Sequence, residues 1–193
     1  QKIELTGLAA VGGEDPEPEF VDINENGEIV VTLQENNHIV VIGADGAVAS
    51  HFDAGTVVLE NVDTKTDGRL SPTETTGSIP REPDGVKWID ADHFATANEG
   101  DWQGGSRGFT IFKKDGTVVY ESGSSLERAI AEIGHYPEKR SKAKGVEIES
   151  VEFARYGDVP YLFVVSERAS VVAVYDVSQL DAPKLLQILP SGV

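Results

Sequence analysis

The sequence contains a threefold internal repeat, which limits the fold to an array of similar units. The aligned segments are 17–52, 82–122 and 147–190. Each opens on an acidic residue, at Glu19, Asp84 and Glu149, and successive members of this set are 65 residues apart. Repeats of this kind fold as supersecondary units that bury their apolar faces by stacking on neighbouring repeats. We therefore expect a stacked array of three similar units.

Each repeat contains four short apolar stretches separated by turn signals. In the first repeat, 20–23 and 28–33 flank Asn26-Gly27, and 39–42 meets 47–52 across Asp45-Gly46. Asn-Gly and Asp-Gly favour tight hairpin turns. Successive four-stranded antiparallel units are typical of a β-propeller, whereas a β-sandwich is the alternative. The predicted fold class is an all-β propeller with about three to four four-stranded antiparallel blades.

Residues 1–193 are expected to form a single, partial propeller domain. Closed propellers have at least about four blades of roughly 40–50 residues, so three units do not close a ring. Residues 2–10 could supply an outer strand of a preceding blade. The remaining blades would come from the same parent protein or from a second copy. The chain starts at Gln1 and lacks Met, so we expect a mature product or a fragment.

Two long connections, 53–81 and 123–145, are read as insertions between blades. The first is polar and rich in turn residues. The second carries the single helical pattern, with Ser124 and Glu127 in the spacing of a capping box. Leu126, Ile130 and Ile133 fall on one face, and Gly134 follows as a stop signal. One short helix is therefore predicted in this insertion.

A second acidic position recurs where the second strand of each repeat ends, at Glu35, Glu99 and Glu167. Because a hairpin reverses the chain, this set and the set that opens each repeat should lie on one rim of the propeller. Hard carboxylate ligands suit calcium or magnesium, and calcium is the expected cofactor. The alternative is that these acids cap inner strands by accepting backbone N–H bonds. The predicted metal ligands are Glu19, Asp84, Glu99, Asp101, Glu149 and Glu167.

Two other polar segments carry weaker signals. Asp63 to Glu74 resembles a calcium-binding EF-hand loop in spacing, but Lys65 occupies a ligand position, so a polar Asp-Gly turn is favoured. Four basic residues gather after the predicted helix and could attract a phosphate or carboxylate, although a solvated loop is the simpler interpretation. They are Lys139, Arg140, Lys142 and Lys144.

The composition excludes several classes of function. A net charge of −17 argues against nucleic acid and anionic membranes as partners, since both attract cationic surfaces. No apolar run is long enough to span a bilayer. With no Cys, the chain has no thiolate zinc site and no cysteine nucleophile. The four His residues show no metal-ligand spacing, and no Gly-x-Ser-x-Gly sequence occurs.

Short strings in all three repeats resemble the choice-of-anchor I family. The strings are Glu17-Pro18-Glu19, Glu82-Pro83-Asp84-Gly85-Val86, Ala97-Asn98-Glu99-Gly100-Asp101, Ser166-Glu167-Arg168 and Val174-Tyr175-Asp176-Val177. The resemblance covers residues 15–190. It implies a propeller in a longer secreted or surface protein, similar to a mesenchyme-specific cell-surface glycoprotein and often labelled alkaline phosphatase-like. Ile148 stands where the family has Pro, and Lys65 interrupts an Asp-rich stretch.

Two functions follow from the acidic rim and the resemblance. The first is a secreted, calcium-dependent β-propeller hydrolase of phosphoesters, alkaline phosphatase- or phytase-like. In it Arg107, Arg168, Lys139 and Arg140 would hold the phosphate. The alternative is a non-catalytic extracellular module that binds a mineral, glycan or protein ligand. No residue identifies itself as a nucleophile or general base, so enzyme status stays open; the expected location is secreted, periplasmic or cell surface.

Overall fold

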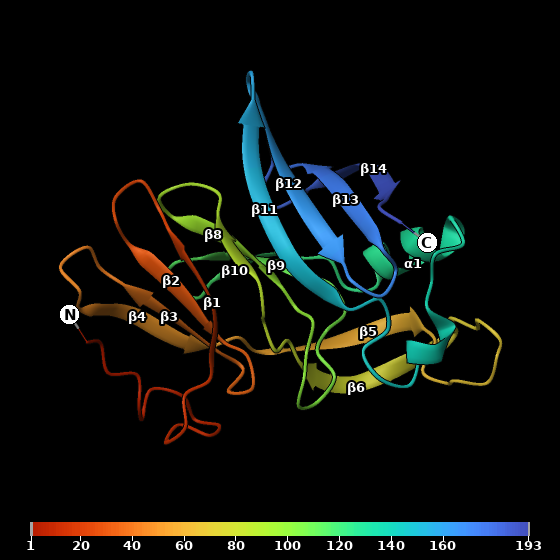
Figure 1. Ribbon diagram of the computed structural model, residues 1–193, viewed down its shortest axis with the longest axis horizontal. Coiled ribbons are helices and arrows are strands. Elements are labelled where there is room, and N and C mark those ends of the chain that lie inside the picture. The colour runs from red at the N-terminus through yellow and green to blue at the C-terminus, as the bar shows by residue number, and fades with distance from the viewer. Residues whose placement is uncertain (1, 193) are drawn as a thin grey trace.

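Three four-stranded antiparallel sheets dominate the computed structural model, which describes residues 2–192 (Figure 1). Each sheet pairs its strands in chain order, as a propeller blade does. The all-β propeller-type fold is therefore confirmed. The first sheet contains β1 (Pro18–Ile23), β2 (Ile29–Leu33), β3 (His38–Ile42) and β4 (Val48–Asp53). The second contains β7 (Val86–Trp88), β8 (His93–Ala97), β9 (Phe109–Lys113) and β10 (Val118–Glu121). The third contains β11 (Ile148–Tyr156), β12 (Val159–Ser166), β13 (Val171–Asp176) and β14 (Lys184–Pro190).

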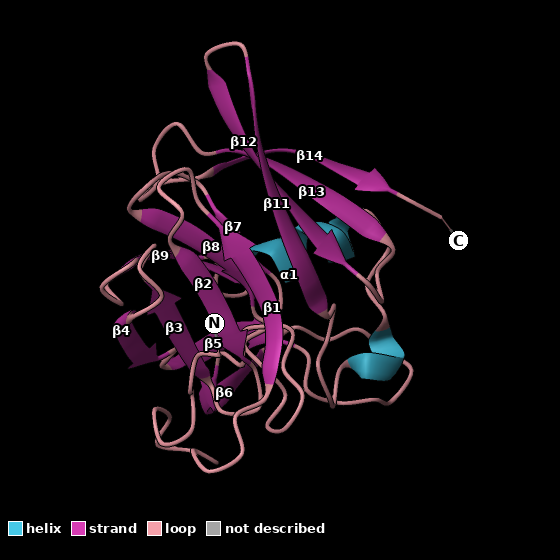
Figure 2. Ribbon diagram, turned by 60° about the vertical axis from the view of Figure 1, so that its left-hand side comes forward, coloured by secondary structure: helices cyan, strands magenta, loops and turns pink. Residues whose placement is uncertain are grey.

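The sheets stack face on face through apolar side chains. Val30, Ile39 and Val41 of the first sheet pack in one cluster with Phe94 and Phe112 of the second. A second cluster joins the opposite face of the second sheet to the third, and α1 (Ser125–Glu132) packs into it (Figure 2). Its members from the two sheets include Ala95, Ala97, Phe109, Ile111, Leu162 and Val164. Strand alternation thus gives the middle blade two buried faces.

The first strands of the three sheets lie next to one another, because β7 contacts both β1 and β11. Gly85 permits the approach of β7 to β11. A Cβ atom at this position would lie 2.8 Å from Ser150 Cα, and the Gly85 N–H donates to Glu149 O at 3.2 Å. A side chain here would push the two inner strands apart.

The insertions are more ordered than the sequence suggests. Residues 53–81, read as a polar connection, contain a hairpin of β5 (Thr56–Val62) and β6 (Glu74–Pro80). Few of their side chains are buried, which explains why their polar composition resembles a loop. The predicted short helix is confirmed as α1, and a 3-10 turn, η1 (Glu138–Arg140), follows it. Within residues 2–192, no helix has the length and apolar character needed to cross a membrane.

Two local predictions about α1 and one about the N-terminal segment are wrong. Ser124 makes no side-chain cap; its hydroxyl instead donates to Glu60 O at 2.6 Å. Ile133 is 45% exposed rather than part of the buried helix face. Residues 2–10 form no strand, and Ile3, Leu5 and Leu8 pack as an irregular arm against the outer face of the first sheet.

Candidate metal centre

The acids that open the three repeats lie where the innermost strands begin. The pairing of β1 with β2 shifts register between Pro18 and Phe20, and that of β11 with β12 shifts between Ile148 and Ser150. Glu19 and Glu149 are therefore bulge residues. A β-bulge redirects the side chain of its extra residue. Asp84 precedes β7, and its N–H donates to Ala97 O at 2.8 Å.

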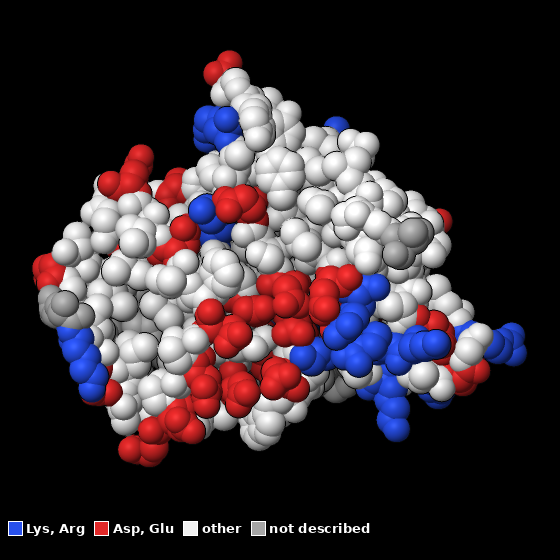
Figure 3. Space-filling model, viewed as in Figure 1, with Lys and Arg blue, Asp and Glu red and all other residues white. Residues whose placement is uncertain are grey.

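Three carboxylates from the second and third blades converge. One carboxylate oxygen from each of Asp84, Glu99 and Glu149 lies within 4.8 Å of the other two. All three residues are half-buried. Figure 3 shows acidic side chains gathered over the region where the ends of β1, β8 and β11 adjoin. The repeat and the close approach at Gly85 together bring acids distant in sequence to one point.

These carboxylates repel one another. Burial, followed by the charges of Glu149 and Glu99, raises the pKa of Asp84 to about 7. Burial and the neighbouring Glu99 also raise the pKa of Glu149. The buried Oε2 atom of Glu149 has no hydrogen-bond partner among the described residues. Negative charge at this point is therefore incompletely compensated by the protein.

Glu99 has the partners that the other two acids lack. Lys144 Nζ lies 2.9 Å from Glu99 Oε1 and 3.2 Å from Asp101 Oδ1. Gln34 Nε2 donates to Glu99 Oε2 at 2.8 Å. The single ammonium group of Lys144 is thus outnumbered by the carboxylates around it.

The strand register shows that Glu35 is not the first-repeat equivalent of Glu99 and Glu167. Val21 pairs with Val31, as Val86 pairs with Thr96 and Val151 with Val164. Counting from these pairs, Gln34 occupies the position of Glu99 and Glu167. Glu35 comes one residue later and is exposed. A slip of one residue moves a strand side chain to the opposite face.

The other three predicted ligands lie around the cluster rather than in it. Glu19 is exposed, although its charge contributes to the raised pKa of Asp84. Asp101 is exposed beside Lys144, and Glu167 is exposed beside Arg168 at 3.4 Å. The structure therefore brings together three of the six acids.

The predicted phosphate-binding residues are engaged elsewhere or lie on the surface. Arg107 is 5% exposed and donates to Asp63 O at 3.1 Å and Ser141 O at 2.7 Å. Arg140 and Arg168 both pair with the carboxylate of the buried Glu147. Lys139 is exposed on η1.

Sequence reasoning missed two buried acids that organise this region. Glu82 and Glu147 precede Asp84 and Glu149 by two residues, and both have positive φ, at 47° and 49°. The Glu82 carboxylate accepts the Asp101 and Gln103 N–H groups, each at 2.7 Å. Glu82 thus fixes the loop that follows Glu99. The repeated Glu-x-acid spacing is the signal that could have identified both residues.

The acids of the segment resembling an EF-hand are already engaged in hydrogen bonds and an ion pair with protein groups. Asp63 Oδ1 accepts the Lys65 N–H at 3.1 Å, and Asp63 Oδ2 accepts the Ser71 N–H at 3.2 Å. Glu74 at the other end pairs with the Lys65 ammonium. Residues 67–69 form a bend, which agrees with the favoured polar turn.

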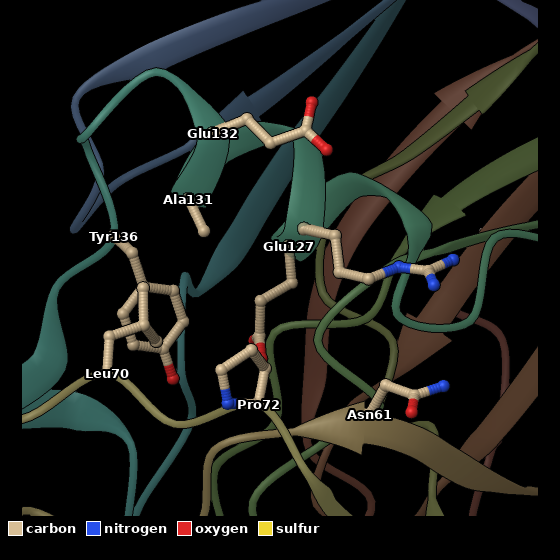
Figure 4. Close-up of a pocket in the computed structure, with 8 residues that line it drawn as sticks. Asn61, Leu70, Pro72, Glu127, Ala131, Glu132 and Tyr136 are labelled. Atoms are coloured by element: carbon tan, nitrogen blue, oxygen red, sulfur yellow. The ribbon is translucent and has the colours of Figure 1, made fainter.

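A pocket of about 330 Å³ lies beside α1, away from the three carboxylates (Figure 4). In the figure, Glu127 extends from α1 toward Pro72, with Tyr136 and Leu70 on the other side. Glu127 is 4% exposed, and burial raises its pKa to about 6 although Arg107 lies 3.5 Å away. A Cβ on Gly145 would lie 2.3 Å from Glu127 Oε2. That oxygen therefore points into the protein interior.

Comparisons with known proteins give one family match and several distant structures. The model of the choice-of-anchor I domain matches residues 102–180. No curated protein matches the sequence. A protein from Lactobacillus plantarum has a TM-score of 0.44 at 11% identity, covering 98% of this chain and 46% of that one. Kluyveromyces lactis Hsv2 has a TM-score of 0.44 at 12% identity, covering 94% and 50%. A Bacteroides fragilis protein provisionally assigned as a 6-phosphogluconolactonase has a TM-score of 0.36 at 13% identity, covering 97% and 59%. The chain thus spans about half the length of these structures.

Proposed function

We propose that this chain is an extracellular propeller module that binds calcium between its second and third blades. Asp84, Glu99 and Glu149 would be the protein ligands. The observation that carries the proposal is their convergence within 4.8 Å. Calcium binds oxygen at about 2.3–2.6 Å, so oxygens on opposite sides of one ion are about 5 Å apart.

The simpler explanation is that these acids accept backbone N–H groups as caps of the inner strands. Among the acids of this region, Glu82 does so instead. Backbone N–H groups of the adjacent loop are accepted by Glu82. Glu99 instead contacts the side chains of Gln34 and Lys144. Glu149 Oε2 is buried without a hydrogen-bond partner in the part of the chain described. A cation would supply the compensation that Glu149 lacks.

A bound cation would have two consequences. It would link the innermost strands of two blades through their carboxylates. It would also need more oxygen ligands than three carboxylates provide, because calcium takes about six to eight. Those ligands could come from a mineral, glycan or protein on the exposed rim. Choice-of-anchor domains are typical of surface or extracellular proteins, which supports such a role.

Hydrolysis of phosphoesters is the second candidate, and one observation favours it. The Lys144 ammonium lies next to Glu99, and Asp84 has a pKa of about 7. A cationic donor and a carboxyl group that titrates near neutrality are groups that a phosphoester hydrolase could use. Calcium would polarise the phosphoryl oxygen and lower the pKa of a bound water. Arg107 would have no direct part because it is buried in contacts with protein carbonyls.

Calorimetric calcium titration of the chelated protein, combined with a phosphatase assay, tests both candidates. If the chain is a binding module, calcium binding should be lost in Glu149→Gln. It should be kept in Glu35→Gln, because Glu35 is an exposed acid outside the cluster. The assay uses p-nitrophenyl phosphate with calcium. Turnover that disappears in Glu99→Gln would favour the hydrolase, whereas binding without turnover would favour the module. Absence of calcium binding in the wild type would contradict both.

A further inference from the structure

The pocket of about 330 Å³ beside α1 lies between the two insertions and is separate from the carboxylate cluster. All of its lining residues belong to these insertions, so no strand of the three blades lines it. Leu70 and Pro72 come from the first insertion, and Ala131 and Tyr136 from the second (Figure 4). Small-molecule sites are mostly apolar with a few polar groups, and occupy about 300–1,000 Å³. This mainly apolar pocket is at the lower end of that range, which favours a ligand with one ring or a short chain.

One buried carboxylate lines the pocket. Glu127 is 4% exposed, and its side chain extends from α1 toward Pro72 in Figure 4. Its Oε2 atom has no hydrogen-bond partner among the described residues, and Arg107 Nη1 lies 3.5 Å from its Oε1 atom. The other charged lining residues, Arg128 and Glu132, are exposed and have opposite signs. A poorly partnered carboxylate is therefore the distinctive polar group of this pocket.

The buried charges behind the pocket do not cancel. Asp63, Arg107 and Glu127 are each at most 5% exposed, so two carboxylates accompany one guanidinium group. Asp63 already accepts hydrogen bonds from the Ser141 hydroxyl and from two backbone N–H groups. Burial raises the pKa of Glu127 to about 6 although Arg107 opposes the shift, and the charge of Asp63 adds to it. Buried charges are stable when paired, so Glu127 is the member of this group that lacks a cation.

We propose that this pocket binds a small organic amine in its protonated form, with the ammonium group on Glu127 and the hydrocarbon part against the apolar wall. The Glu127 carboxylate lies on the interior side, so the hydrocarbon part would fill the mouth of the pocket. The ring of Tyr136 can add a cation–π contact. Calcium fits less well here, because it needs about six to eight oxygen ligands and the pocket offers one buried carboxylate. The net charge of −17 also attracts cations to the protein surface.

An NMR titration of the isotope-labelled chain with 2-phenylethylamine at neutral pH tests this assignment. The wild type should bind with a Kd of about 0.1–1 mM, and the shifted amides should centre on α1 and on the segment that carries Leu70 and Pro72. The uncharged analogue 2-phenylethanol should bind at least about tenfold more weakly, because it cannot pair with the carboxylate.

Glu127→Gln should weaken amine binding by at least about tenfold, because it removes the charge and keeps the size of the side chain. Glu60→Gln is the matched control. It alters an exposed acid of β5 that does not line the pocket, so it should bind the amine as the wild type does.

A second variant keeps the test valid if Glu127→Gln does not fold. Ala131→Leu places a larger side chain in the pocket and leaves Glu127 and Arg107 unchanged. It should fold with the wild-type circular dichroism spectrum and lose amine binding. A wild type that does not bind the amine below about 10 mM, or that binds 2-phenylethanol equally well, would overturn the proposal. Unchanged binding in Glu127→Gln or Ala131→Leu, or an equal loss in Glu60→Gln, would also overturn it.

Discussion

Two groups of acidic residues in this protein differ in how fully their charges are paired with cationic side chains. Behind α1, the buried Glu127 lies 3.5 Å from Arg107, and the buried Glu147 is paired with both Arg140 and Arg168. At the inner ends of the blades, Asp84, Glu99 and Glu149 share a single nearby ammonium group, that of Lys144, which contacts Glu99. Guanidinium groups thus accompany the first group of carboxylates, while the second remains mostly uncompensated.

This contrast separates structural charge from charge available for binding. If Asp84, Glu99 and Glu149 served only the fold, they could be paired with arginine, as Glu147 is. Closely spaced carboxylates without such partners raise one another's pKa and lower stability unless a cation is added. Changes at the two groups should therefore alter stability in opposite directions.

The largest effect is expected when the buried pair is broken by Arg107→Met. This change leaves Glu127 buried without its cationic partner and removes the donors to Asp63 O and Ser141 O. We expect the free energy of unfolding to fall by about 3–5 kcal/mol, measured by urea denaturation. The control Arg69→Met alters an exposed arginine and should leave the transition unchanged. A loss below about 1 kcal/mol would show that the buried network is not structural.

An intermediate effect of opposite sign is expected for Asp84→Asn in chelator. The folded-state pKa of Asp84 is about 7, above the ordinary 3.8, so the folded protein holds this proton more tightly than the unfolded chain. That contribution is complete below about pH 4 and is lost as the pH rises to 7. At pH 8 the variant should be more stable than the wild type by about 1–2 kcal/mol, after allowance for solvent screening.

The difference between Asp84→Asn and wild type should shrink as the pH falls toward 5. Glu127, whose pKa is also raised, titrates in both proteins and so cancels from the comparison. Urea denaturation at a series of pH values measures the effect. A variant that is less stable than the wild type at pH 8 would mean that Asp84 is a structural cap.

A smaller effect is expected from Gln34→Glu, which adds a carboxylate at the first-blade equivalent of Glu99. It also removes the donor to Glu99 Oε2. Without calcium, the variant should lose about 1 kcal/mol of stability. Its calcium affinity should increase several-fold, because affinity rises with ligand charge. Gln34→Met removes the donor without adding charge and should show the loss of stability alone; equal calcium affinity in both variants would place Gln34 outside the site.

The hairpins and blades were predictable because their signals are local. Asn26-Gly27 turns between β1 and β2, and alternating apolar residues define the strands on either side. The β5–β6 hairpin was missed because only two of its side chains are buried, so no buried alternation distinguishes it from a polar loop. Sequence patterns report burial more directly than they report strand pairing.

The sequence was sufficient to predict which acids of the second and third repeats lie near one another, but not which residue of the first repeat faces them. The 65-residue spacing located Asp84 and Glu149 at equivalent points, and the structure places Glu99 beside them. Glu35 was misplaced because a single-residue choice in β2 decides which side chain faces the axis, and Gln34 takes that place. The role of Arg107 depends on contacts with residues 34 to 44 positions away, which no local pattern reveals.

Calcium binding by the carboxylate cluster should be visible as a calcium-dependent change in the free energy of unfolding. For the wild type at pH 7.5, raising calcium from a chelated state to 100 times its dissociation constant should add about 2.7 kcal/mol of stability. Glu149→Gln should lose most of this increment, while Glu35→Gln should retain it. Identical unfolding transitions with chelator and with calcium in the wild type would contradict the account, since the clustered carboxylates would then be stable without a cation.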